Sequence, residues 1–152
     1  MKGIKKILLG LLVVLIFIQF WHPARNNSGQ VMPNDITKTV ALPGEVQGIL
    51  KKSCYNCHSN QTDYPWYTYI QPLHWYLNNH IQEGKAALNF NEFGAYSSRR
   101  QLSKLRAIES SIKDAKMPLP SYTLMHNNAI LSESEKALLM SWLEKANESL
   151  AK

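Results

Sequence analysis

The stretch that decides the fold is Ser53-Cys54-Tyr55-Asn56-Cys57-His58, which contains both cysteines of the chain. The spacing C-x-x-C-H is typical of covalent c-type haem attachment. Two thiols one helical turn apart can each add across a haem vinyl group to form a thioether. The adjacent histidine then presents its imidazole to the iron as an axial ligand. The sequence therefore predicts one covalent haem c per chain, attached at Cys54 and Cys57 with His58 on the iron.

Three other uses of the cysteine pair stay open. A thioredoxin-like redox pair would lie beside a βαβ unit, and the sequence shows no convincing parallel strands. A structural zinc ion needs four ligands, so two histidines would have to join the cysteines. A disulfide between Cys54 and Cys57 is an alternative in an oxidising compartment. An export signal and the absence of other cysteines favour haem.

The N-terminus has the features of an export signal that stays attached. Three lysines precede the apolar run 7–20, and this charge sets the orientation with the N-terminus in the cytoplasm. Extended over 4–21, the run reaches the length of a membrane span, about 17–25 residues. The following residues lack the small Ala-x-Ala pattern of a cleavage site, so we expect a signal-anchor over 1–22 rather than a cleaved signal peptide. This predicts a single-pass protein of the bacterial inner membrane with a periplasmic C-terminal domain.

Charge and composition divide the rest of the chain. The formal charge of +6, from 17 Lys+Arg against 11 Asp+Glu, would suggest a nucleic-acid partner. However, four of the basic residues precede the first acidic residue, Asp35, and the remainder carries only +2. We therefore expect no nucleic-acid partner. Residues 23–41, rich in Pro, Asn, Ser, Gly and Thr, predict a flexible tether, and residues 42–150 predict the folded domain.

Apolar periodicity in this domain predicts an all-α fold with long loops. One helix over 44–53 runs into the cysteine motif, and a second begins at Pro72 and ends near Gly84. A third begins at Ser98, and the last begins with a capping box at Ser132. Because a domain of this size has a modest core, a buried haem would supply part of its apolar centre. The aromatic side chains Trp66 and Tyr67 fit a haem wall and an ordinary core equally well.

The predicted iron needs a second axial ligand. The candidates are His74, His80, His126, Met117 and Met125. We favour Met117, because Pro118 makes its loop rigid and no helical backbone blocks its approach. His–Met ligation is that of electron-transfer cytochromes. A role for Met117 as apolar filler is the alternative, and Met125-His126 is the second choice. Four lysines are candidates for steering an acidic redox partner: Lys51, Lys52, Lys113 and Lys116.

Three segments together resemble the small bacterial haem-binding domain family, which is related to c-type cytochromes. They are Cys54-Tyr-Asn-Cys-His-Ser-Asn-Gln-Thr-Asp-Tyr-Pro-Trp-Tyr67, Lys116-Met-Pro-Leu-Pro-Ser-Tyr122 and Leu131-Ser-Glu-Ser-Glu-Lys136. The resemblance covers residues 42–148 and implies a cytochrome-c-like helical fold. It implies attachment at Cys54 and Cys57 and axial ligation by His58, and it matches Met117 to the Met-Pro element of cytochromes c. The segment 66–100 is longer than in a minimal cytochrome c.

These observations predict a membrane-tethered monohaem c-type cytochrome that transfers single electrons between redox partner proteins in the periplasm. No catalytic residue is assigned. The alternative is a haem enzyme, for example with peroxidase-like activity, or a gas or redox sensor, whose sixth iron site is open or labile. A third hypothesis is a scaffold or metal module that uses the cysteine pair without haem.

Overall fold

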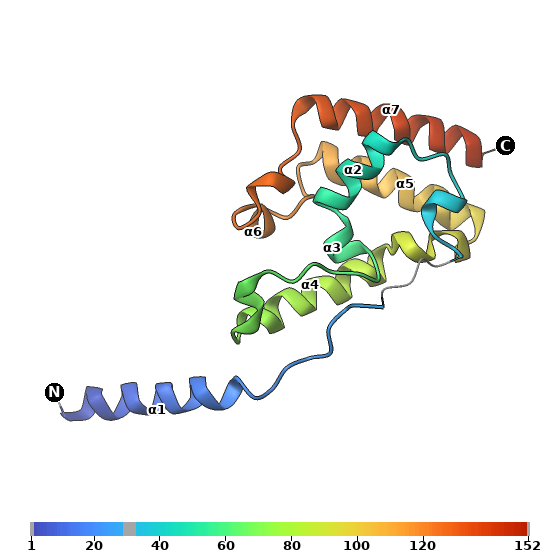
Figure 1. Ribbon diagram of the computed structural model, residues 1–152. Helices are drawn as coiled ribbons and strands as arrows, with labels where there is room; N and C mark the ends of the chain where they lie inside the picture. Colours follow the sequence, from blue (N-terminus) through green and yellow to red (C-terminus); the bar gives the residue numbers. More distant parts are fainter. Residues whose placement is uncertain (1, 29–32, 152) are drawn as a thin grey trace.

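The computed structural model describes residues 2–28 and 33–151, and within these ranges the chain is helical (Figure 1). The described residues contain no β-strand, only an isolated antiparallel bridge between Asn27 and Gln61. The predicted all-α class is therefore confirmed.

Four helices make most of the body, and shorter turns connect them. The α-helices are α1 (Lys2–Ile18), α2 (Gly44–Ser53), α3 (Tyr55–His58), α4 (Leu73–Ala87), α5 (Ser98–Lys113), α6 (Pro120–Thr123) and α7 (Glu133–Leu150). The 3₁₀ helices are η1 (Ile36–Lys38), η2 (Trp66–Tyr69), η3 (Phe90–Ala95) and η4 (Asn127–Ala129). The predicted capping box is present at the start of α7, where the Ser132 hydroxyl accepts from the Glu135 backbone N–H. The predicted end of α4 at Gly84 is wrong, because the helix continues to Ala87.

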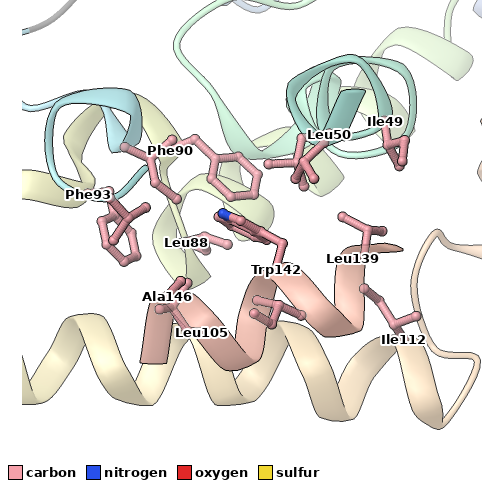
Figure 2. Packing of buried hydrophobic residues seen from close by; sticks show 14 of the residues in the cluster. Ile49, Leu50, Leu88, Phe90, Phe93, Leu105, Ile112, Leu139, Trp142 and Ala146 are labelled. Atoms are coloured by element: carbon pink, nitrogen blue, oxygen red, sulfur yellow. The ribbon is translucent and has the colours of Figure 1, made fainter. Parts of the chain in front are cut away.

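The hydrophobic core lies where α5, α7 and α2 meet the segment after α4. In Figure 2, Phe90 and Leu88 point toward Trp142 of α7, with Leu50 of α2 beside them. The Trp142 indole N–H donates to the Ala41 carbonyl at 2.9 Å, so α7 also holds the chain just before α2. The core therefore combines residues from the beginning of the domain, around α2, with residues from its end, on α7.

The segment predicted to be a flexible tether, 23–41, packs on the body at both of its described ends. Ile36 and Val40 are buried in the hydrophobic core. Asn26 is also buried, and its side-chain amide donates to the Ser59 carbonyl and the Thr62 hydroxyl, both at 2.9 Å. The packed body thus starts before residue 42. Two isolated apolar residues, Ile36 on η1 and Val40 just after it, are too few to give a detectable period, so the sequence pattern does not predict their burial.

Helix α1 projects from the body (Figure 1), and its large apolar side chains from Ile4 to Phe17 are exposed. Within the two described ranges, no helix has both the length and the apolar character needed to cross a membrane.

Candidate functional site

The cysteine motif forms a closed helical turn at the end of α2. Cys54 follows α2 directly, and Cys57 and His58 lie in α3. The backbone N–H groups of Cys57 and His58 both donate to the Cys54 carbonyl, at 3.2 and 3.0 Å. Both cysteines are free thiols and half-buried. The turn therefore holds two thiols and one imidazole on a single short element.

Both thiols are kept protonated by their surroundings. Burial raises the pKa of Cys54 to about 12, with a smaller contribution from Cys57, and it raises the pKa of Cys57 to about 11. A thioredoxin-like redox pair depends on the opposite change, a lowered pKa that yields a reactive thiolate. The environment of this pair thus lacks the property that such a function requires.

His58 is oriented by a backbone carbonyl at the end of α4. Its Nδ1 lies 3.1 Å from the Leu88 carbonyl oxygen, which can only accept, so Nδ1 carries the proton and donates. Burial lowers the pKa of His58 despite this hydrogen bond, which keeps the ring neutral. A neutral imidazole with a protonated Nδ1 has its free lone pair on Nε2, the arrangement typical of a metal-ligating histidine.

Two adjoining apolar cavities, of about 220 and 280 Å³, lie beside the motif. The residues that line both of them are Ser53, Cys54, His58, Ala87, Met117 and Pro118. The first cavity extends between Phe90 and α5, and the second extends past Cys57 toward α4. Cys54, His58 and Met117 thus line both cavities, and Cys57 lines the second one.

Met117 reaches this space from a tightened loop after α5. The backbone N–H groups of Lys116 and Met117 both donate to the Ser111 carbonyl, at 2.9 and 3.2 Å. The loop therefore folds back on the last turn of α5 instead of running away from it. Met117 thus lies just beyond the third helix of the domain, as the sequence predicts.

The other candidates for an iron ligand have different surroundings. His74 lines neither of the two cavities, and the ring of His126 is hydrogen-bonded to the Tyr67 hydroxyl at 2.7 Å. Met125 is exposed and lines a neighbouring cavity instead. His80 lines the second cavity together with His58, and its buried Nε2 has no hydrogen-bond partner. Among these candidates, Met117 and His80 are thus the side chains that share a cavity with His58.

Sequence reasoning missed two contributions from α4. Gly84 lies inside the helix, where a Cβ would come within 2.6 Å of the Cys57 carbonyl oxygen. Glycine therefore lets α4 pack directly on the motif. The second contribution is the Leu88 carbonyl that orients His58. An isolated glycine within an apolar helical pattern signals such a close approach, whereas a backbone carbonyl leaves no trace in residue types.

The aromatic stretch after the motif divides between the site and the surface. Tyr67 lines the neighbouring cavity together with Cys57, while Trp66 is exposed to solvent. For Trp66, the predicted core role is therefore wrong, and its side chain lines neither of the two cavities beside the motif. Tyr122 contacts the motif, because its hydroxyl accepts from the Asn56 side-chain amide at 2.7 Å.

The residues at the site fit a haem better than a bare metal ion. Within residues 2–28 and 33–151, no group of three or more His, Cys, Asp and Glu side chains is arranged to hold a metal ion. A tetrahedral zinc site would need four such ligands. By contrast, two protonated thiols, one neutral imidazole and a thioether border the same apolar cavities. This donor set suits a large apolar cofactor that is attached through sulfur.

Comparison with known proteins gives one family. The sequence model of a haem-binding domain matches residues 13–145, which include the cysteine motif, α4 and the Met117 loop. No curated protein and no solved structure matches the chain. The match confirms the resemblance seen in the sequence and supports haem as the cofactor. The chain belongs to the haem-binding domain family.

Proposed function

We propose that this protein is a monohaem c-type cytochrome that carries single electrons at the periplasmic face of the inner membrane. The observation that carries the proposal is the shared pair of cavities bordered by Cys54, Cys57, His58 and Met117. A bound haem supplies an iron that gains and loses one electron. The protein needs no substrate pocket beside it for this purpose.

Each side chain of the site has a distinct role in this proposal. The S–H groups of Cys54 and Cys57 would add across the two vinyl C=C bonds of a haem, with each sulfur bonding one vinyl carbon and each thiol proton moving to the other. This addition requires no oxidant or reductant. His58 would ligate the iron through Nε2, because its Nδ1 donates to the Leu88 carbonyl. Met117 would be the second ligand, from the loop after α5, and a His–Met pair raises the reduction potential.

Helix α1 is the proposed membrane anchor, with its N-terminus in the cytoplasm. Its apolar side chains are exposed throughout, and the three lysines before residue 7 supply the positive charge expected on the cytoplasmic side. An electron carrier fixed there would meet partners of the same compartment. Three of the lysines predicted to steer them, Lys52, Lys113 and Lys116, form ion pairs within the chain, so Lys51 is the better candidate for a partner contact.

A second candidate function is a haem enzyme or sensor with a labile sixth site. The observation that favours it is the exposure of the Met117 side chain, at 37%. A ligand on a partly exposed loop residue is easier to displace than one on a buried residue.

Spectroscopy of the holoprotein separates the two functions. Electron transfer predicts low-spin, six-coordinate spectra in both oxidation states, a reversible one-electron redox titration, and no binding of carbon monoxide to the ferrous form. A high-spin ferrous protein that binds carbon monoxide at once would contradict electron transfer and favour the enzyme or sensor.

A further inference from the structure

A cluster of large apolar side chains stands exposed on η2 and the first turns of α4. Its members are Trp66, Tyr69, Ile70, Leu73 and Tyr76, each between 45% and 72% exposed. Residues three apart share a face on both kinds of helix, which brings Trp66 beside Tyr69 and Leu73 beside Tyr76. The two elements are in direct contact. A gathered apolar surface of this kind on a water-soluble body usually marks an interaction site.

The segment that carries this cluster has no charged residue of its own, because the sequence from Tyr64 to Gln82 contains no Asp, Glu, Lys or Arg. The charged group that contacts the cluster is the Arg25 guanidinium, which donates to the Tyr69 hydroxyl at 3.2 Å. Protein-binding surfaces keep a polar and charged rim around their apolar centre, whereas surfaces at the membrane–water interface gather Trp, Tyr and apolar side chains. The polar atoms that the cluster presents are Tyr hydroxyl and Trp indole groups, which are typical of the membrane–water interface.

The end of α1 is hydrogen-bonded to the base of the cluster. The Gln71 backbone N–H donates to Gln19 Oε1 at 2.9 Å, and Gln19 Nε2 donates to the Gln71 carbonyl at 3.2 Å. The buried Gln71 side chain and the Trp75 indole both donate to the Trp21 carbonyl, at 2.9 and 3.0 Å. Four hydrogen bonds therefore fix the residues just after α1 to Gln71, between η2 and α4, and to Trp75 of α4.

Aromatic contacts extend this attachment along the segment after α1. The Arg25 guanidinium lies over the rings of Tyr64 and Tyr69, 5.0 and 4.3 Å from their centroids. His22 meets the buried ring of His74 edge-on, with the centroids 5.7 Å apart. These contacts hold the body directly against the residues that follow α1, so residues 19–25 do not act as a free tether.

We propose that the cluster of Trp66, Tyr69, Ile70, Leu73 and Tyr76 is a membrane-contact surface that rests on the lipid headgroups beside α1. The inference builds on the proposed anchoring by α1. If α1 spans the bilayer, Gln19 and Trp21 lie at its outer interface, and the residues bonded to them lie there too. The surface then orients the haem-binding body relative to the membrane and shields η2 from soluble partners.

Photo-crosslinking in vesicles tests this surface. Full-length holoprotein is reconstituted in phosphatidylethanolamine–phosphatidylglycerol vesicles with benzoylphenylalanine replacing Trp66, Leu12 or Glu144, one position at a time. Leu12 reports on α1, and Glu144 is an exposed control on α7, on the far side of the body from α1 (Figure 1). The covalent haem absorbance of each variant confirms folding, and Tyr76 replaces Trp66 as the probe position if that variant fails to fold.

We expect lipid adducts at positions 66 and 12 and none at 144. Adducts at 12 with none at 66 would overturn the membrane-contact surface while leaving the anchor intact. A dimer crosslinked through position 66, or an adduct with another protein there, would also overturn it. Absence of lipid adducts at both 12 and 66 would refute the anchor itself, and the surface with it.

Discussion

His58 is made suitable for binding a metal by a hydrogen bond to a backbone carbonyl, a partner that cannot be recognised from residue types. The donation from Nδ1 to the Leu88 carbonyl fixes the tautomer and leaves Nε2 with a free lone pair, on a residue that lines both cavities. The sequence predicts Cys54, Cys57 and His58 because a short motif places them on one turn. It could not predict the partner of His58, since a carbonyl at the end of α4 becomes adjacent only in the folded chain.

At this scale the decisive substitution is Met117→Ala. It removes the proposed second ligand, so the ferrous protein should change from no binding to stoichiometric binding of carbon monoxide. The reduction potential should also fall, because thioether ligation favours the ferrous state. Titration with carbon monoxide and optical redox titration measure the two effects.

Met125→Ala is the matched control for this substitution. Met125 is exposed and lines neither of the cavities that border His58. Its variant should keep the spectrum and potential of the unmodified protein. If Met125→Ala opened the iron to carbon monoxide and Met117→Ala did not, the ligand assignment would be wrong.

Among the elements, α4 does more than the sequence pattern indicates. The pattern predicts its start after Pro72 but ends it at Gly84, because glycine commonly follows the last turn of a helix. In the structure, the absence of a side chain at Gly84 serves close packing on Cys57 instead. The start of α7 was easier to predict, since the capping box of Ser132 and Glu135 is a local device.

The substitution Gly84→Ala tests this contact. Its Cβ would meet the Cys57 carbonyl at 2.6 Å, and backbone cannot rotate away as a side chain does. We expect the free energy of unfolding to fall by about 1–3 kcal/mol, as for other overpacked sites. The displacement of α4 should also loosen the hydrogen bond that His58 Nδ1 donates to the Leu88 carbonyl and alter the haem spectrum. Guanidinium denaturation and absorbance spectra measure these changes.

Gly48→Ala is the control for the helical glycine itself. Gly48 lies in α2, and nothing stands within 4 Å of a Cβ there. The free energy of unfolding of this variant should rise by about 0.5–1 kcal/mol, because alanine favours the helix more than glycine does, and the haem spectrum should not change. Equal stabilisation of both alanine variants would show that α4 does not pack on the motif as described.

In the molecule as a whole, residues of the segment after α1 contact residues of the folded body that lie far away in the sequence. Composition separates an anchor, a tether and a domain, because polar residues without periodicity predict a loop. The structure adds contacts that span long sequence separations, such as Asn26 with Ser59 and His22 with His74. These contacts depend on tertiary packing of single side chains, and no local pattern reports them.

This packing predicts a pH dependence of stability. Burial lowers the pKa of His74 below its ordinary value of 6.5, and His22 and Arg25 lower it further. The folded state then binds fewer protons than the unfolded state as the pH falls below about 6.5, so stability is full above that pH and is lost beneath it.

Melting temperatures of the full chain between about pH 8 and pH 5 measure this effect. The wild-type protein should lose stability toward acid, and His74→Gln should lose less over the same interval because Gln does not titrate. A variant with the same acid slope as the wild type would show that His74 does not contribute to the pH dependence.

The central claim is that haem is bound covalently through Cys54 and Cys57. Mass spectrometry of proteolytic peptides from protein made with the haem-attachment machinery tests it directly. We predict that the peptide containing both cysteines carries one haem, resists extraction into acidic organic solvent, and has no thiol open to alkylation. Haem that is extracted, leaving a peptide with two alkylatable thiols, would contradict the account.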